Sequence, residues 1–150
     1  MPKTLAQLIN DGTIINKAGE TVKIEDIAKP GKHVGLYFSA HWCPPCRGFT
    51  PVLTEFYNKV KASDKADKLE IIFLSSDRDE KSFKDYFGEM PWLALSFGDD
   101  DIKGEVSSEF NIRGIPSLII IDGATGEVKS SDGRGLVSSD VNGEKFPWGL

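Results

Sequence analysis

The chain has 150 residues, of which 39% are hydrophobic, and its net charge at pH 7 is -5. This length and apolar content suffice for one sizeable core, so we expect residues 1–150 to form a single domain. The negative net charge argues against a nucleic-acid partner. The sequence has neither an apolar secretory signal nor an apolar stretch of about 20 residues, so we expect a protein of the cytoplasm or the nucleus that binds no membrane. We also expect a monomer.

Predicted strands and helices alternate along the chain. Hydrophobic periodicity and turn residues predict, in order, a helix over 5–9, hairpin strands over 13–15 and 21–23, a strand over 32–40, a helix from Cys43 to about Ala62, a strand over 69–75, a helix over 82–87, a helix between 102 and 110, and hairpin strands over 117–121 and 127–131. The strand, helix and strand from 32 to 75 predict a parallel right-handed crossover. We therefore expect an α/β fold with a mixed central sheet, helices on both faces and an N-terminal β-hairpin extension.

The only two cysteines, Cys43 and Cys46, stand where a predicted buried strand leads into an amphipathic helix. The positive end of the helix macrodipole stabilises a thiolate, so we expect the pKa of Cys43 to lie below the value of about 8.5 of a free thiol. Pro44 and Pro45 fit the first turn, where amides have no carbonyl partner, and they leave Cys46 as the donor to the Cys43 sulfur. This placement favours redox chemistry, with Cys43 as nucleophile and Cys46 as the resolving thiol.

The cysteine pair has two alternative roles, a structural zinc site and a purely structural disulfide. Structural zinc normally takes four Cys or His ligands, and only His33 and His41 are available to join the cysteines. A purely structural disulfide would close too short a loop to constrain the unfolded chain, and this chain is long enough to fold without one. Both roles are less consistent with the sequence than catalysis.

Several aromatic residues permit two interpretations. Trp42, beside Cys43, is either part of the core or an exposed platform on which a partner docks. Trp92 either lines the same surface or packs in the core. We expect His41 to be a solvated bystander, and Phe146 and Trp148 to anchor the C-terminal tail.

The segment Trp42-Cys43-Pro44-Pro45-Cys46-Arg47 resembles the active-site signature of the tryparedoxin and nucleoredoxin group of the thioredoxin superfamily. Most thioredoxins have Gly-Pro between the two cysteines. Further segments resemble landmarks of the group, in the same order, and cover nearly the whole chain: Gly48-Phe49-Thr50-Pro51, Ser75-Ser76-Asp77-Arg78, Met90-Pro91-Trp92-Leu93-Ala94-Leu95, Gly114-Ile115-Pro116-Ser117 and Phe146-Pro147-Trp148.

The resemblance implies a thioredoxin-like fold and a substrate-binding surface around the cysteines. In this superfamily the proline that opens the C-terminal hairpin is cis and faces the cysteines, and Ile115-Pro116 occupies that position. Composition alone would favour an ordinary trans bond. The implied surface that meets substrate comprises Trp42, Pro44, Pro45, Ile115 and Pro116.

One position departs from ordinary thioredoxins. Tyr37 stands where those proteins have a buried aspartate, six residues before the nucleophile. A tyrosine there resembles the tryparedoxin pattern. The base that activates Cys46 is left open, with water or an acidic side chain brought near by folding as the alternatives.

The resemblance implies a protein-disulfide reductase that uses no metal and no organic cofactor. Its expected substrates are protein disulfides, such as those of peroxiredoxins. Its electron donor would be a low-molecular-weight thiol such as trypanothione or glutathione, or a reductase. The alternative is a redox-sensitive binding module that regulates signalling partners, as the nucleoredoxin resemblance permits.

Overall fold

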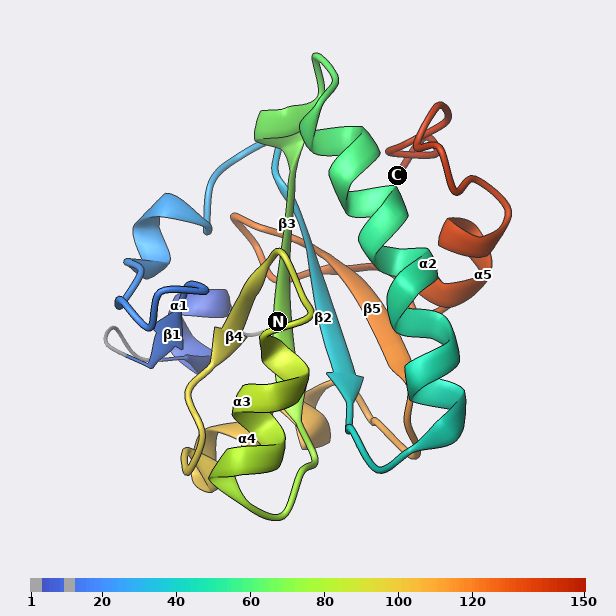
Figure 1. Cartoon of the computed structure of the whole chain (residues 1–150). Helices are drawn as coiled ribbons and strands as arrows, with labels where there is room; N and C mark the ends of the chain where they lie inside the picture. Colours follow the sequence, from blue (N-terminus) through green and yellow to red (C-terminus); the bar gives the residue numbers. More distant parts are fainter. Residues whose placement is uncertain (1–3, 10–12) are drawn as a thin grey trace.

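The computed structural model describes residues 4–9 and 13–150, and six strands within these ranges form one mixed sheet (Figure 1). The order across the sheet is β1-β4-β3-β2-β5-β6. The strands are β1 (Ile14–Ile15), β2 (His33–Ser39), β3 (Leu69–Ser75), β4 (Leu93–Leu95), β5 (Ser117–Asp122) and β6 (Val128–Ser130). The central strand β2 runs parallel to β3 and antiparallel to β5. The predicted mixed sheet is confirmed.

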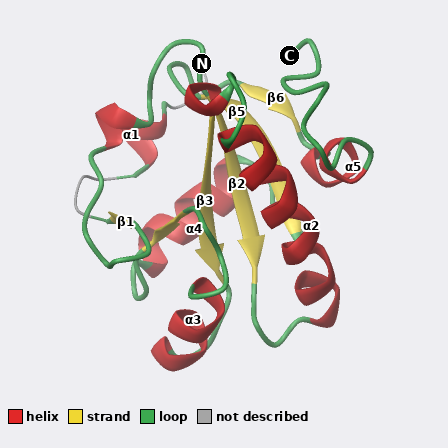
Figure 2. Ribbon diagram, turned by 45° about the horizontal axis from the view of Figure 1, so that its top comes forward, coloured by secondary structure: helices red, strands yellow, loops and turns green. Residues whose placement is uncertain are grey.

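Helices cover both faces of the sheet (Figure 2). One face packs against α2 (Pro44–Lys61), α3 (Glu80–Phe87) and α5 (Gly133–Ser138), and the other against α1 (Leu5–Leu8), the short 3-10 helix η1 (Ile24–Asp26) and α4 (Asp100–Glu109). A second 3-10 helix, η2 (Ala66–Lys68), leads from α2 into β3. Alternation along β2 divides its side chains between the two layers, with Tyr37 beneath α2 and Leu36 and Phe38 on the opposite face.

The N-terminal hairpin is present in a reduced form. Its two arms are joined by a single bridge between Ile15 and Thr21, and the chain enters η1 directly afterwards. The first arm instead pairs with β4, where Ile14 lies opposite Leu95. Ile14 is fully buried, so packing in the core decides this pairing.

Four elements were absent from the sequence prediction: the short 3-10 helices η1 and η2, the strand β4 and the helix α5. Strand β4 has only three residues, too few to show a period, and α5 contains the weak helix former glycine at two of its six positions. Both are stabilised by neighbours: β4 by pairing with β3, and α5 by packing against β5 and α2. The remaining predicted elements are present within a few residues of their expected bounds.

The C-terminal tail is anchored by aromatic residues, as expected. Phe146 is 1% exposed and packs edge-on against Phe56 of α2, while Trp148 stacks on Phe56 at a centroid distance of 5.5 Å. Asp140 accepts a hydrogen bond of 2.9 Å from the Trp148 indole.

Trp92, expected either on the surface or in the core, belongs to the core and is 1% exposed.

No helix in the described part of the chain is long and apolar enough to span a lipid bilayer. The sequence predicts no secretory signal at the N-terminus, and residues 1–3 of that segment lie outside the described residues.

Candidate active site

Cys43 and Cys46 form a disulfide at the point where β2 leads into α2. Cys43 is the N-cap of α2, and its sulfur accepts a hydrogen bond of 3.4 Å from the Cys46 backbone N–H. Pro44 and Pro45 occupy the first turn, as predicted, and supply no competing donor. Cys43 is 5% exposed, whereas Cys46 is fully buried. An external thiol or disulfide therefore reaches Cys43 more readily.

The loop before β5 lies against the disulfide. The Ile115-Pro116 peptide bond is cis, which confirms the expectation for this position. Ile115 is half-buried and packs against the two cysteines. The Arg134 guanidinium donates a hydrogen bond of 3.2 Å to the Pro116 carbonyl. The fold thus brings a segment about 70 residues away in sequence to the cysteines.

Trp42 forms an exposed apolar surface beside Cys43. Its side chain is 54% exposed, and its indole N–H donates a hydrogen bond of 3.0 Å to the Ser76 carbonyl. The platform interpretation of Trp42 therefore agrees with the structure, and the core interpretation is wrong. The flanking Pro44 and Pro45 are exposed as well, which leaves an apolar surface around the buried disulfide.

Asp77, to which the sequence assigned no role, holds the loop that carries Trp42. This buried carboxylate accepts hydrogen bonds from the His41 backbone N–H at 2.8 Å and from the Ser75 hydroxyl at 2.7 Å. The signal in the sequence was an aspartate two residues beyond a buried strand, where a carboxylate commonly fixes a turn. The His41 ring stacks on Tyr86, so it is packed and not merely solvated.

Four buried hydroxyl groups form a cluster beneath the first turn of α2. The Thr50 hydroxyl lies at its centre, 2.6 Å from the Tyr37 hydroxyl and 2.6 Å from the Tyr86 hydroxyl. The Ser39 hydroxyl lies 2.7 Å from that of Tyr86. Thr50 also donates a hydrogen bond of 3.0 Å to the Cys46 carbonyl. The cluster therefore contacts the backbone of the buried cysteine.

The number of protons constrains the direction of these bonds. Each hydroxyl has one proton to donate. If Thr50 donates to the Cys46 carbonyl, it must accept from both Tyr37 and Tyr86. The Tyr37 proton is then shared between the Thr50 oxygen at 2.6 Å and the Cys46 carbonyl at 3.4 Å. Ser39 then donates to Tyr86, and every proton of the cluster is used. In this arrangement the hydroxyl dipoles converge on the Cys46 carbonyl.

Tyr37 does not act as a base near neutral pH. Burial raises the pKa of its phenol far above the ordinary value, because the charged phenolate would lose its hydration. A neutral hydrogen-bond donor thus occupies the position of the buried carboxylate of ordinary thioredoxins.

We expect Thr50→Val to lower the free energy of unfolding by about 1–3 kcal/mol, because it removes the centre of the cluster and leaves two tyrosine hydroxyls without their partner. The matched control is Thr54→Val, which makes the same change one turn later on α2, where the side chain is half-buried. Urea denaturation of both variants measures the difference. Equal stability of the two variants would contradict this role of Thr50.

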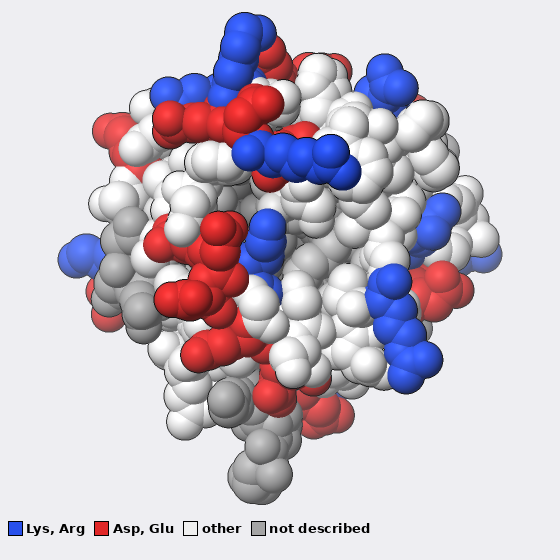
Figure 3. Space-filling model, turned by 90° about the horizontal axis from the view of Figure 1, so that it is seen from below, with Lys and Arg blue, Asp and Glu red and all other residues white. Residues whose placement is uncertain are grey.

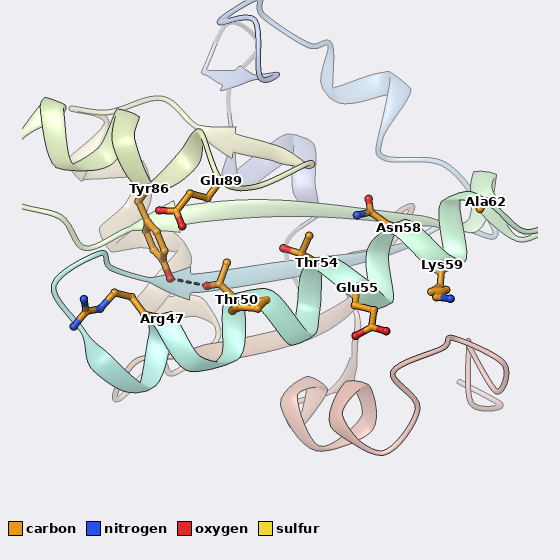
Figure 4. A pocket seen from close by; sticks show the side chains of 10 residues that line it. Arg47, Thr50, Thr54, Glu55, Asn58, Lys59, Ala62, Tyr86 and Glu89 are labelled. Atoms are coloured by element: carbon orange, nitrogen blue, oxygen red, sulfur yellow. Dashed lines mark hydrogen bonds between the residues drawn. The ribbon is translucent and has the colours of Figure 1, made fainter.

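A groove of about 610 Å³ extends along α2 beside the disulfide (Figure 4). Arg47 and Thr50 line the end near the cysteines, Thr54 lines the middle, and Asn58 lies toward the far end. Tyr86 and Glu89 form the facing wall. The disulfide itself does not line this groove. Within residues 4–9 and 13–150, no group of three or more His, Cys, Asp or Glu side chains is arranged to hold a metal ion.

Comparison with known proteins gives a consistent result. The thioredoxin-like family model matches residues 31–128. Tryparedoxin from Trypanosoma brucei brucei is 44% identical over 135 residues, which cover 90% of both chains. Nucleoredoxin from Mus musculus is 44% identical over 147 residues, which cover 98% of this chain but 32% of the relative. This chain therefore spans about a third of the length of the nucleoredoxins it matches.

Solved structures show the same similarity. Native tryparedoxin I from Crithidia fasciculata superposes with a TM-score of 0.84 at 39% identity, covering 96% of each chain. Tryparedoxin II complexed with glutathionylspermidine has a TM-score of 0.85 at 33% identity, covering 96% of this chain and 97% of the other.

Proposed function

Because the chain belongs to the thioredoxin-like family, in the group of the tryparedoxins and nucleoredoxins, we propose that it is a protein-disulfide reductase. The observation that carries this proposal is the Cys43–Cys46 disulfide at the N-terminus of α2, with Cys43 as its more exposed member. The positive helix end and the Cys46 N–H both favour a thiolate at Cys43. The exposed Trp42, Pro44 and Pro45 and the half-buried Ile115 form the apolar surface where the substrate binds. Pro116, which the sequence also placed on this surface, is buried.

The reaction is a dithiol-disulfide exchange. The Cys43 thiolate attacks one sulfur of the substrate disulfide, forming a mixed disulfide and releasing the other sulfur as a thiolate that takes up a proton. Cys46 then loses its proton and attacks the Cys43 sulfur, which releases the second substrate thiol. Two electrons pass to the substrate, and the protein is left with the Cys43–Cys46 disulfide.

A donor must reduce this disulfide for the next cycle. We propose a low-molecular-weight thiol, such as glutathione or a glutathione–polyamine conjugate, or a reductase as the donor, and peroxiredoxin-like disulfides as substrates. The complex of a structural neighbour with glutathionylspermidine supports a donor of this class. A reductase requires a reducing compartment, which is the cytoplasm or the nucleus.

A second candidate is a redox-sensitive binding module, which the exposed Trp42 and the nucleoredoxin relatives support. Insulin reduction with dithiothreitol, glutathione or trypanothione as donor separates the two. Multiple turnovers with at least one donor support the reductase. Stoichiometric binding of a disulfide protein without turnover supports the module and contradicts the reductase.

A further inference from the structure

The arginines of this chain are gathered around the disulfide although the chain is acidic. The sequence contains four, and the net charge is -5. All four are exposed and lie on segments that border the active site: Arg47, Arg78, Arg113 and Arg134. We call these four residues the arginine ring.

Arg78 contacts the apolar surface directly, and Arg134 contacts the loop before β5 that lies against the disulfide. The Arg78 guanidinium lies 5.7 Å from the centroid of the exposed Trp42 ring. The Arg134 guanidinium lies 5.7 Å from the Phe49 ring and donates its hydrogen bond to the Pro116 carbonyl. These contacts hold both charges near the entrance to the disulfide and leave further N–H donors available on each guanidinium.

The other two members are close to the site in the chain. Arg47 directly follows Cys46 and lines the groove along α2. Arg113 precedes Ile115 by two residues, on the loop that packs against the cysteines.

None of the four arginines forms a salt bridge with a carboxylate in the described residues. The six ion pairs found there all use lysine or histidine as the cation. The chain has more acidic than basic residues, yet none of these guanidinium groups pairs with one of its carboxylates within the described ranges. Each of them can therefore bind a carboxylate of another molecule.

The charges are unevenly distributed on this end of the molecule. Figure 3 looks at the molecule from below the view of Figure 1, toward the end where β2 leads into α2. Acidic side chains form a group on the left of this view, whereas most charged side chains on the right are basic.

The ring extends across three neighbouring strands. Arg78 follows β3, whereas Arg134 contacts the residue before β5, and β2 lies between these strands. Neighbouring strands are about 4.8 Å apart, so β3 and β5 are separated by about 10 Å. An extended peptide that passes over the disulfide can cross this width.

We propose that the arginine ring selects protein substrates whose disulfide is flanked by aspartate or glutamate residues. The proposal rests on the proposed reductase function and names its substrate class. Guanidinium groups bind carboxylates through paired, charge-assisted hydrogen bonds, and a basic rim accelerates the approach of an acidic segment. The group that reacts with the Cys43–Cys46 pair is a protein disulfide, which favours an acidic peptide over a nucleic acid as the occupant.

The test compares peptides that contain the same disulfide flanked by Glu, Gln or Lys residues. At low ionic strength we expect kcat/KM for the Glu peptide to exceed that for the Lys peptide about tenfold or more, and this ratio should shrink at high salt. The combined variant Arg47→Gln, Arg78→Gln, Arg113→Gln and Arg134→Gln should abolish the preference. The single variants Arg47→Gln and Arg78→Gln should each lower the ratio of kcat/KM for the Glu peptide to that for the Lys peptide about two- to fivefold. These two variants test the proposal if the combined variant does not fold.

The matched control removes the same number of positive charges at the opposite end of the sheet. It carries Lys23→Gln, Lys29→Gln, Lys59→Gln and Lys68→Gln, all at exposed positions. The control should keep the preference for the Glu peptide. Equal rates for the three peptides, or the same loss in the lysine control, would overturn the proposal.

Two further measurements separate this proposal from the proposed function. Reduction of oxidised mercaptoethanol, a small uncharged disulfide, reports the cysteine chemistry alone, so its absence would contradict the reductase and not the ring. Binding of a Glu-flanked peptide with serines in place of its cysteines reports the ring without turnover. Tighter binding of a random oligonucleotide than of this peptide would count against an acidic peptide as the occupant.

Discussion

Cys43→Ser should abolish disulfide exchange, lowering turnover by about a thousandfold or more, whereas Cys46→Ser should accumulate a stable mixed disulfide with the substrate. The reason is the asymmetry of the two positions. Cys43 is the N-cap of α2 and is partly accessible, whereas Cys46 is fully buried. Without Cys46 the first exchange still takes place, but no internal thiol attacks the Cys43 sulfur. Non-reducing electrophoresis and mass spectrometry of protein incubated with a disulfide substrate measure the adduct.

The control for this experiment is Thr54→Val, which leaves both cysteines and the hydroxyl cluster in place and should turn over normally. A double variant with serine at both cysteines should form no adduct. If Cys43→Ser and Cys46→Ser trapped substrate equally, the assignment of nucleophile and resolving thiol would be wrong.

Phe146→Ala should lower the free energy of unfolding by about 3–5 kcal/mol, because it removes a fully buried ring and leaves a cavity that the surrounding rings cannot fill. Phe146 packs edge-on against His33 at the start of β2 and against Phe56 of α2, with centroid distances of 5.8 and 5.9 Å. It also contacts Trp148, so the tail beyond it should detach from α2 in the variant.

Urea denaturation, with the Trp fluorescence of the tail as a second probe, measures this loss. The matched control is Leu150→Ala in the same tail, where the side chain is 37% exposed and the change should stay within about 0.5 kcal/mol. A loss of similar size in both variants would show that Phe146 does not anchor the tail.

Local sequence patterns were sufficient to locate the unit that carries the cysteines. The apolar run before Ala40 and the periodic apolar positions after Phe49 determine a strand and a helix through contacts within one segment. Cys43 and Cys46 therefore lie where the sequence predicted, at the helix N-terminus. The same patterns predicted β3 with its exact bounds, because Leu69–Ser75 is a segment of strand length that is apolar except for Glu70 and the final Ser75.

Residues whose roles depend on distant partners could not be assigned in this way. Asp77 supports Trp42 by binding the backbone of His41, which is 36 residues away in sequence. Strand β4 exists because β3 and β1 pair with it, although its three residues show no strand period. Trp92 had two interpretations until the packing of α2 and α3 enclosed it.

The sequence by itself indicated the chemistry of this protein, because its two cysteines stand at a predicted helix N-terminus and too few further Cys or His residues are present for a structural zinc site. The tertiary structure alone decided the surroundings. It placed hydroxyls from β2, α2 and α3 beneath Cys46, and it brought Arg78 and Arg134, from two separate segments, to Trp42 and Pro116. The physical reason is that hydrogen bonds and charges act through space, and only the folded sheet brings these segments within range of one another.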